Sequence, residues 1–225
     1  MPKLALPSAS RPGLLTTEIV GGGLAFGLSI GLFFSLARGV LGQPMGALDE
    51  QAFAVADRWR AAAPWLTGMV LFVTLFGSLK FLLPASLLVF YWLRRRGHGR
   101  HVLALLLAMS SGWVLNTLLK GWFHRPRPTS ALLYQLGQNQ LGQSFPSGHA
   151  MLSIAFYGYL AWLLVGYGRR GWAAMLLGWA GLIGLTRVYL HVHYLTDVLA
   201  GFAGGVGWLL LLGAGLKALG QARTA

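Results

Sequence analysis

The sequence predicts an all-α integral membrane protein of six spanning helices, and three observations support this fold class. Of the 225 residues, 56% are hydrophobic and only 10% are charged, whereas a soluble domain carries about 25% charged residues. Apolar runs of roughly 20 residues, the length that crosses a bilayer as a helix, recur along the chain. Lys and Arg gather between these runs, as topogenic signals do. We therefore expect one membrane-embedded domain over residues 1–225.

A first span and an interfacial helix are expected in the N-terminal third. Residues 14–37 form an apolar run behind Lys3 and Arg11. The run is longer than the core of a secretory signal and has no clean cleavage site, so we expect a retained span. Residues 45–61 mix apolar side chains with Asp, Glu and Arg. This mixture predicts an amphipathic helix that lies in the membrane interface.

Five further spans follow this interfacial segment. The second lies within residues 64–93, which at about 1.5 Å per residue is longer than one crossing requires. Three residues are candidates to break, tilt or kink it: Gly77, Lys80 and Pro84. The remaining spans are expected at residues 101–119, 148–165, 171–189 and 195–216.

The basic clusters predict the number of spans and the orientation. They precede the first span, separate the second from the third and the fourth from the fifth, and follow the sixth. With six spans, all of these clusters lie on one side, which the positive-inside rule assigns to the cytoplasm. Both termini are then cytoplasmic. The segments after the third span, before the fourth and between the last two fall on the outer face.

Polar clusters occur at those outer-face positions, and the first two suit a phosphate. In KGWFHRPRP, Lys120 and Arg127 present an ammonium and a guanidinium on a loop that proline restrains. In PSGH, Ser147 is a good N-cap, and Gly148 lets an anion approach the free amides of a helix start. His149 in the same turn is placed to donate a proton. The alternatives are lipid headgroup anchoring and a plain helix cap.

The third cluster is TRVYLHVHYLTD. His193 and Asp197 are four residues apart and can touch. An acid at a membrane boundary is costly without a partner or a role, and Asp197 is the only acid in the last three spans. A carboxylate on one imidazole nitrogen leaves the other basic, as in activated nucleophiles. Arg187 adds a cation. A structural His–Asp–Arg network is the alternative.

Taken in order, these motifs resemble the signature of the type 2 phosphatidic acid phosphatase superfamily. The signature reads Lys, six residues, Arg-Pro; then Pro-Ser-Gly-His; then Arg, five residues, His, three residues, Asp, and it spans residues 120–197. Thr186 replaces the family's usual Ser before the last Arg.

The resemblance implies hydrolysis, without metal or other cofactor, of a phosphate or diphosphate on a membrane lipid. Candidate substrates are phosphatidylglycerol phosphate, phosphatidic acid and undecaprenyl diphosphate, at the outer (periplasmic) face of a bacterial inner membrane. By the resemblance, His193 attacks phosphorus and forms a phosphohistidine, Asp197 orients it, and His149 protonates the leaving oxygen. The phosphoryl oxygens are held by Lys120, Arg127, Ser147, Gly148 and Arg187.

Other function classes fit the residues less well. A metal site would need His191 beside His193, but residues two apart on a helix point to different faces, and the chain has no Cys. An intramembrane serine protease built on Ser147 would leave the cations without a role. A non-catalytic six-span anion or lipid transporter, and a lipid phosphotransferase using the same site, stay open. No nucleic-acid motif and no obligate protein partner is indicated.

Overall fold

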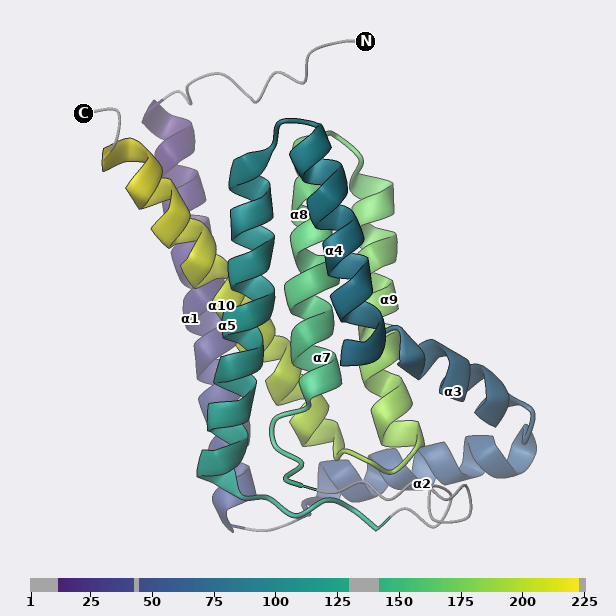
Figure 1. Ribbon diagram of the computed structural model, residues 1–225. Helices are drawn as coiled ribbons and strands as arrows, with labels where there is room; N and C mark the ends of the chain where they lie inside the picture. The colour runs from purple at the N-terminus through teal and green to yellow at the C-terminus, as the bar shows by residue number, and fades with distance from the viewer. Residues whose placement is uncertain (1–11, 43–44, 130–141, 223–225) are drawn as a thin grey trace.

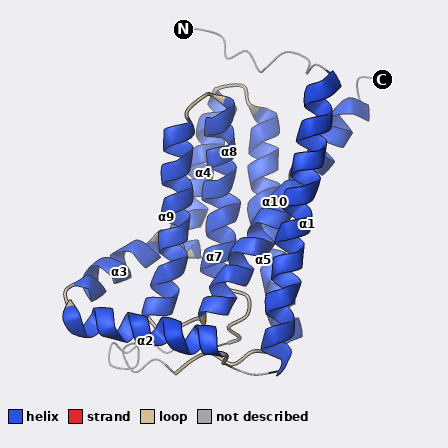
Figure 2. Cartoon of the chain, turned by 180° about the vertical axis from the view of Figure 1, so that it is seen from behind, coloured by secondary structure: helices blue, strands red, loops and turns tan. Residues whose placement is uncertain are grey.

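The computed structural model describes residues 12–42, 45–129 and 142–222, and the regular elements within these ranges are all helices (Figures 1 and 2). The all-α fold class is confirmed. The elements are α1 Pro12–Gly42, α2 Ala47–Ala62, α3 Leu66–Leu75, α4 Leu79–Arg95, α5 Gly99–Phe123, α7 Gly148–Ser153, a π-helical turn η1 Ile154–Gly158, α8 Tyr159–Gly166, α9 Arg170–Tyr189 and α10 Leu195–Ala222. Lys3 and Arg11 lie outside the described residues.

The number of candidate spans agrees with the prediction. Within the described ranges, five helices, counting α7–η1–α8 as one, are long and apolar enough to cross a bilayer. The pair α3 and α4 passes the same test together but bends by 48° at the break between its halves, and it brings the total to six when counted as one span. Of the three candidate breakers, Gly77 lies in the break, whereas Pro84 is accommodated inside α4.

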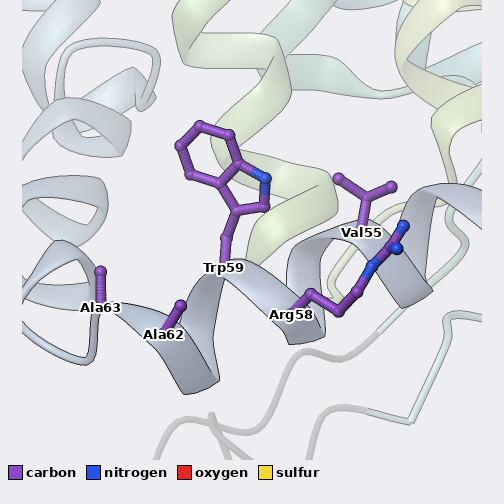
Figure 3. A pocket seen from close by; sticks show the side chains of 5 residues that line it. All are labelled: Val55, Arg58, Trp59, Ala62 and Ala63. Carbon is purple, nitrogen blue, oxygen red and sulfur yellow. The ribbon is translucent and has the colours of Figure 1, made fainter.

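Helix α2 lies across one end of the bundle, at the opposite end from the start of α1 and the end of α10 (Figure 1). One face of α2 is buried and includes Asp49 and Ala56. A second stripe is exposed and apolar: Leu48, Val55 and Trp59. Val55 and Trp59 line a surface pocket of about 370 Å³ together with Arg58 (Figure 3). This division into protein-facing, apolar and polar faces fits the expected interfacial helix.

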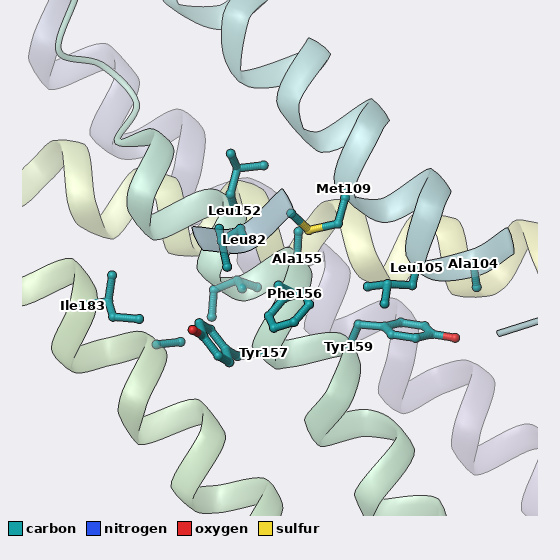
Figure 4. Close-up of a cluster of buried hydrophobic side chains, with 12 residues drawn as sticks. Leu82, Ala104, Leu105, Met109, Leu152, Ala155, Phe156, Tyr157, Tyr159 and Ile183 are labelled. Carbon is teal, nitrogen blue, oxygen red and sulfur yellow. The ribbon is translucent and has the colours of Figure 1, made fainter. Parts of the chain in front are cut away.

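The core surrounds the helix formed by α7, η1 and α8, which is the most buried candidate span. Its side chains Leu152, Phe156 and Tyr159 pack with Leu105 of α5 and Ile183 of α9 (Figure 4). Outward faces of the surrounding helices instead carry exposed Leu, Phe and Trp side chains, as expected for surfaces that meet lipid tails. The first turn of α7 is therefore surrounded by the other helices and lies toward the end of the bundle that carries α2 (Figure 1).

Close helix packing sets the position of that first turn. Gly201 of α10 lies so near α7 that a Cβ atom there would be 2.7 Å from the Ser147 carbonyl oxygen. The backbone N–H of Ser147 donates to the carbonyl oxygen of Asp197 at 3.0 Å. Glycine at the contact lets the backbones of α7 and α10 meet, as in other membrane helix pairs.

Candidate active site

All predicted site residues lie at the end of the bundle that carries α2, on segments that the fold brings together. They are Lys120 near the end of α5, Arg127 in the following loop, Ser147, Gly148 and His149 at the start of α7, Arg187 at the end of α9, His193 in the turn between α9 and α10, and Asp197 in the first turn of α10. The side chains of Ser147, Arg187, His193 and Asp197 are buried.

The loop before α7 is anchored on both sides. The Ser144 N–H donates to the Arg125 carbonyl at 2.8 Å, and the Ser144 hydroxyl donates to the Pro126 carbonyl at 3.0 Å. Phe145 is fully buried against Phe33 and Phe123. These contacts tie the Pro-Ser-Gly-His segment to the Lys120–Pro128 loop, so the first two sequence motifs form one unit.

The contact between His193 and Asp197 is present. The His193 Nδ1 atom lies 3.3 Å from Asp197 Oδ2, which also accepts the Tyr194 N–H at 3.0 Å. His193 precedes α10 rather than belonging to it. Asp197, in the first turn, reaches back to the amide of the residue before the helix, as in a capping box. The same carboxylate thus caps the helix and orients the imidazole.

The second nitrogen of His193 faces Arg127. Its Nε2 atom lies 3.3 Å from Arg127 Nη1, which also donates to the Val192 carbonyl at 2.9 Å. Because Asp197 can only accept when ionised, we assign the His193 proton to Nδ1, so Nε2 is unprotonated and its lone pair accepts from Arg127 Nη1. Burial, followed by the charges of Arg127, Lys120 and Arg187, lowers the pKa of His193 well below its usual value. The imidazole is therefore neutral near pH 7.

The predicted phosphate ligands include buried donors with no protein acceptor. The Nε atoms of Arg127 and Arg187 and the hydroxyl of Ser147 are buried and make no hydrogen bond to any residue that the structure describes. An unsatisfied buried polar group costs about 1–3 kcal/mol, and oxygens of a phosphoryl group satisfy such donors well. Lys120 Nζ donates to the carbonyl of Gln143 at 2.6 Å.

The broken span also contributes to this region. Arg187 Nη1 donates to the hydroxyl of Thr74 at 2.6 Å, so the last turn of α3 fixes one cation of the site. Gly77 in the break lies against the ring of His149 and against Ile183. Sequence reasoning flagged the break but gave neither Thr74 nor Gly77 a place at the site.

Two further charged residues belong to the site and were not assigned to it from the sequence. Arg125 is buried and pairs with Asp197 at 2.5 Å and with Asp49 of α2 at 2.8 Å. The only sequence signal for Arg125 was its place on the predicted outer side, between Lys120 and Arg127 but at none of the signature positions.

His191 is directed away from His193. It stacks on Phe53 with ring centroids 4.2 Å apart, and its Nε2 lies 3.3 Å from a carboxylate oxygen of Asp57. His191 and His193, which the alternative of a metal site requires together, thus have different neighbours. Among the described residues, no group of three or more His, Cys, Asp or Glu side chains is placed to hold a metal ion.

Comparison with known proteins gives consistent results. The model of the PAP2 superfamily matches residues 101–218, a range that contains every predicted site residue. Phosphatidylglycerophosphatase B of Bacillus subtilis (strain 168) is 33% identical over 189 residues, which are 80% of this chain and 89% of that protein.

Two solved structures share the fold. The crystal structure of a transmembrane PAP2 type phosphatidylglycerolphosphate phosphatase from Bacillus subtilis superposes with a TM-score of 0.69 at 28% identity, over 84% of this chain and 96% of that one. LpxE from Aquifex aeolicus superposes with a TM-score of 0.60 at 26% identity, over 75% of this chain and 96% of that one.

Proposed function

Because this chain belongs to the PAP2 superfamily and is a membrane lipid phosphatase, we propose that it cleaves lipid phosphates through a phosphohistidine on His193. The observation that carries this proposal is the set of buried, unsatisfied donors of Arg127, Arg187 and Ser147. They accompany an imidazole whose Nε2 faces Arg127 and whose Nδ1 is held by Asp197. A phosphoryl group among these donors would be stabilised by charge and position, which dominate phosphoryl transfer.

In the proposed first step, the Nε2 lone pair of His193 attacks phosphorus, and the bond from phosphorus to the lipid oxygen breaks. Asp197 stabilises the positive charge that develops on the ring. The leaving oxygen takes a proton from His149. In the second step, water attacks the phosphohistidine and gives a proton back to His149, which releases inorganic phosphate and restores both side chains.

The proposed substrate is a membrane lipid that carries a terminal phosphoryl group. The contacts described above involve only groups that bind phosphoryl oxygens. The similarity to phosphatidylglycerophosphatase B supports phosphatidylglycerol phosphate as the first substrate to test. Phosphatidic acid, a phosphomonoester, and undecaprenyl diphosphate, which carries its terminal phosphoryl group on a second phosphate, complete the panel.

We place the site at the outer face of the bacterial inner membrane. The arginines of the α4–α5 loop and of the α8–α9 loop lie at the end of the bundle opposite α2 (Figure 1). The positive-inside rule assigns that end to the cytoplasm. The catalytic end then faces the periplasm, and both termini are cytoplasmic.

The proposal is tested by measuring phosphate release from this panel by the purified protein in EDTA. We expect release from at least one lipid, and we expect His193→Ala to remove it by about 10³-fold or more, because a nucleophile is worth at least as much as general acid–base help. Strict dependence on added metal would contradict the mechanism. Loss of phosphate from the donor lipid only when an acceptor lipid is supplied, with the phosphate recovered on that acceptor, would indicate a phosphotransferase. Hydrolysis of no lipid would favour a transporter.

A further inference from the structure

A buried chain of charged side chains links α2 to the nucleophile. Arg125 lies between two carboxylates: its Nη1 donates to Asp197 Oδ1 at 2.5 Å, and its Nη2 donates to Asp49 Oδ2 at 2.8 Å. The guanidinium also stacks on the ring of Tyr194 at 3.9 Å. Arg125, Asp49 and Asp197 are all at most 3% exposed, so water screens these contacts weakly.

The two oxygens of Asp197 have separate partners. Oδ1 accepts from Arg125, whereas Oδ2 accepts from His193 Nδ1 and from the Tyr194 amide. The contact with Arg125 therefore fixes the rotation of the carboxylate, with Oδ2 turned toward the imidazole. A carboxylate held on one side only would be freer to rotate away from His193.

Asp49 accepts from one arm of the Arg125 guanidinium, while the other arm donates to Asp197. Its Oδ2 accepts from Arg125 Nη2 and from the hydroxyl of Thr196 at 2.9 Å, and its Oδ1 accepts the Thr196 N–H at 2.9 Å. An arginine facing one carboxylate commonly binds both oxygens. Arg125 Nη2 donates to Asp49, and Nη1 is shared between the Thr196 hydroxyl at 2.8 Å and Asp197 Oδ1. Asp49 thus holds one arm of the fork away from Asp197, and Asp197 Oδ2 accepts from His193.

We propose that Asp49 and Arg125 are positioning residues for the proposed reaction. By sharing one guanidinium between two carboxylates, they hold Asp197 in the rotation that orients His193. The inference rests on the proposed nucleophile role of His193. It also makes the interfacial helix a supporting part of the active site, because α2 supplies the carboxylate that keeps Arg125 from binding Asp197 with both arms.

The test compares Asp49→Asn with Asp57→Asn, using phosphatidic acid in detergent micelles as the probe. Asp57 lies on the same helix and is 55% exposed, so the same substitution there is a matched control. A displacement approaching 1 Å at a reacting group can cost about 10²-fold in rate. We expect Asp49→Asn to lower kcat about 10- to 100-fold with KM changed less than about threefold, and Asp57→Asn to leave both near wild type.

A second variant separates positioning from folding. Arg125→Lys keeps the charge but not the fork, so it should lower kcat while the protein still elutes as a folded species. If division of the fork is the role of Asp49, the double variant with Asp49→Asn should be about as slow as the slower single variant. The inference would be overturned if the double variant lost kcat by the product of the two single losses. It would also be overturned by a rise in KM with kcat unchanged, or by equal losses in Asp49→Asn and Asp57→Asn.

Phosphoenzyme trapping separates this inference from the proposed function. With substrate labelled in the phosphate, wild type should form labelled His193 quickly and Asp49→Asn slowly. Equal rates of labelling would overturn the positioning role alone. A wild-type enzyme that releases phosphate without passing through labelled His193 would overturn the proposed mechanism, whatever the behaviour of Asp49.

Discussion

Gly201→Ala tests whether the packing of α10 on α7 sets the geometry of the site. The residue lies four positions after Asp197, on the same face of α10. An alanine Cβ would be 2.7 Å from the Ser147 carbonyl oxygen, 2.9 Å from Ala150 Cβ and 3.3 Å from the Met151 backbone nitrogen. Two of these neighbours are backbone atoms, so rotation of a side chain cannot relieve the contact.

The expected magnitude follows from these distances. The contact with Ser147 is about 0.7 Å short of the 3.4 Å at which ordinary van der Waals contact begins, so α7 and α10 must separate by an amount of this order. Overpacking of this kind costs about 1–3 kcal/mol of stability. It also moves Ser147 away from Asp197, whose carbonyl accepts its N–H. A shift approaching 1 Å can cost about 10²-fold in rate, and we expect kcat to fall about 10- to 100-fold.

The assay is phosphate release from phosphatidic acid, together with thermal unfolding in the same detergent. Gly204→Ala is the matched control: it lies on the same helix, and its Cβ would have no neighbour closer than 3.5 Å. Alanine in a helix interior is favoured over glycine by about 0.5–1 kcal/mol, so this control should be as active as wild type and no less stable. Wild-type kcat in Gly201→Ala would refute the reasoning.

Two further predictions concern charge and orientation. Because the pKa of His193 is lowered in the folded protein, the unfolded chain binds a proton below about pH 6.5 that the folded protein excludes. The free energy of unfolding should therefore fall as pH drops below about 6.5, by up to about 1.4 kcal/mol per pH unit. His193→Asn should show a shallower fall in unfolding experiments at pH 5.5 and 7.5, and an equal fall would contradict the burial of a neutral imidazole. Because the chain has no natural cysteine, Ala61→Cys and Arg96→Cys can be labelled singly in intact cells; the impermeant reagent should reach position 61 only, and labelling of position 96 instead would reverse the proposed orientation.

The spans and the contact between His193 and Asp197 were predictable because they depend on local pattern. Apolar length predicts a crossing, and the spacing of His193 and Asp197 predicts their contact. The spacing argument assumed one helix for both, whereas His193 precedes α10 and the contact comes from the way Asp197 caps it. The predicted contact was still correct, because residues four apart approach each other both within a helix and where a residue in the first turn caps the helix start.

The pairing of Asp49 with Arg125 was beyond the reach of sequence reasoning. The two residues are 76 positions apart, and the pattern of α2 shows which residues share a face but not what covers that face. The prediction of an amphipathic helix gave no separate role to any of its acids. Asp49 is instead buried with Ala56, seven residues away and on the same side, while Asp57 remains exposed at the surface.

The break at Gly77 has a consequence for the second span as a whole. A Cβ atom at this position would overlap Ile183 Cγ2 and would lie 3.0 Å from His149 Cδ2 and 3.2 Å from the Ser153 hydroxyl. In the bent span, the space that a side chain at position 77 would enter is thus occupied by Ile183 and by the ring of the proposed proton donor. A glycine at the break therefore lets His149 pack against the second span, so the bend of a membrane crossing and the placement of the proposed acid depend on the same residue.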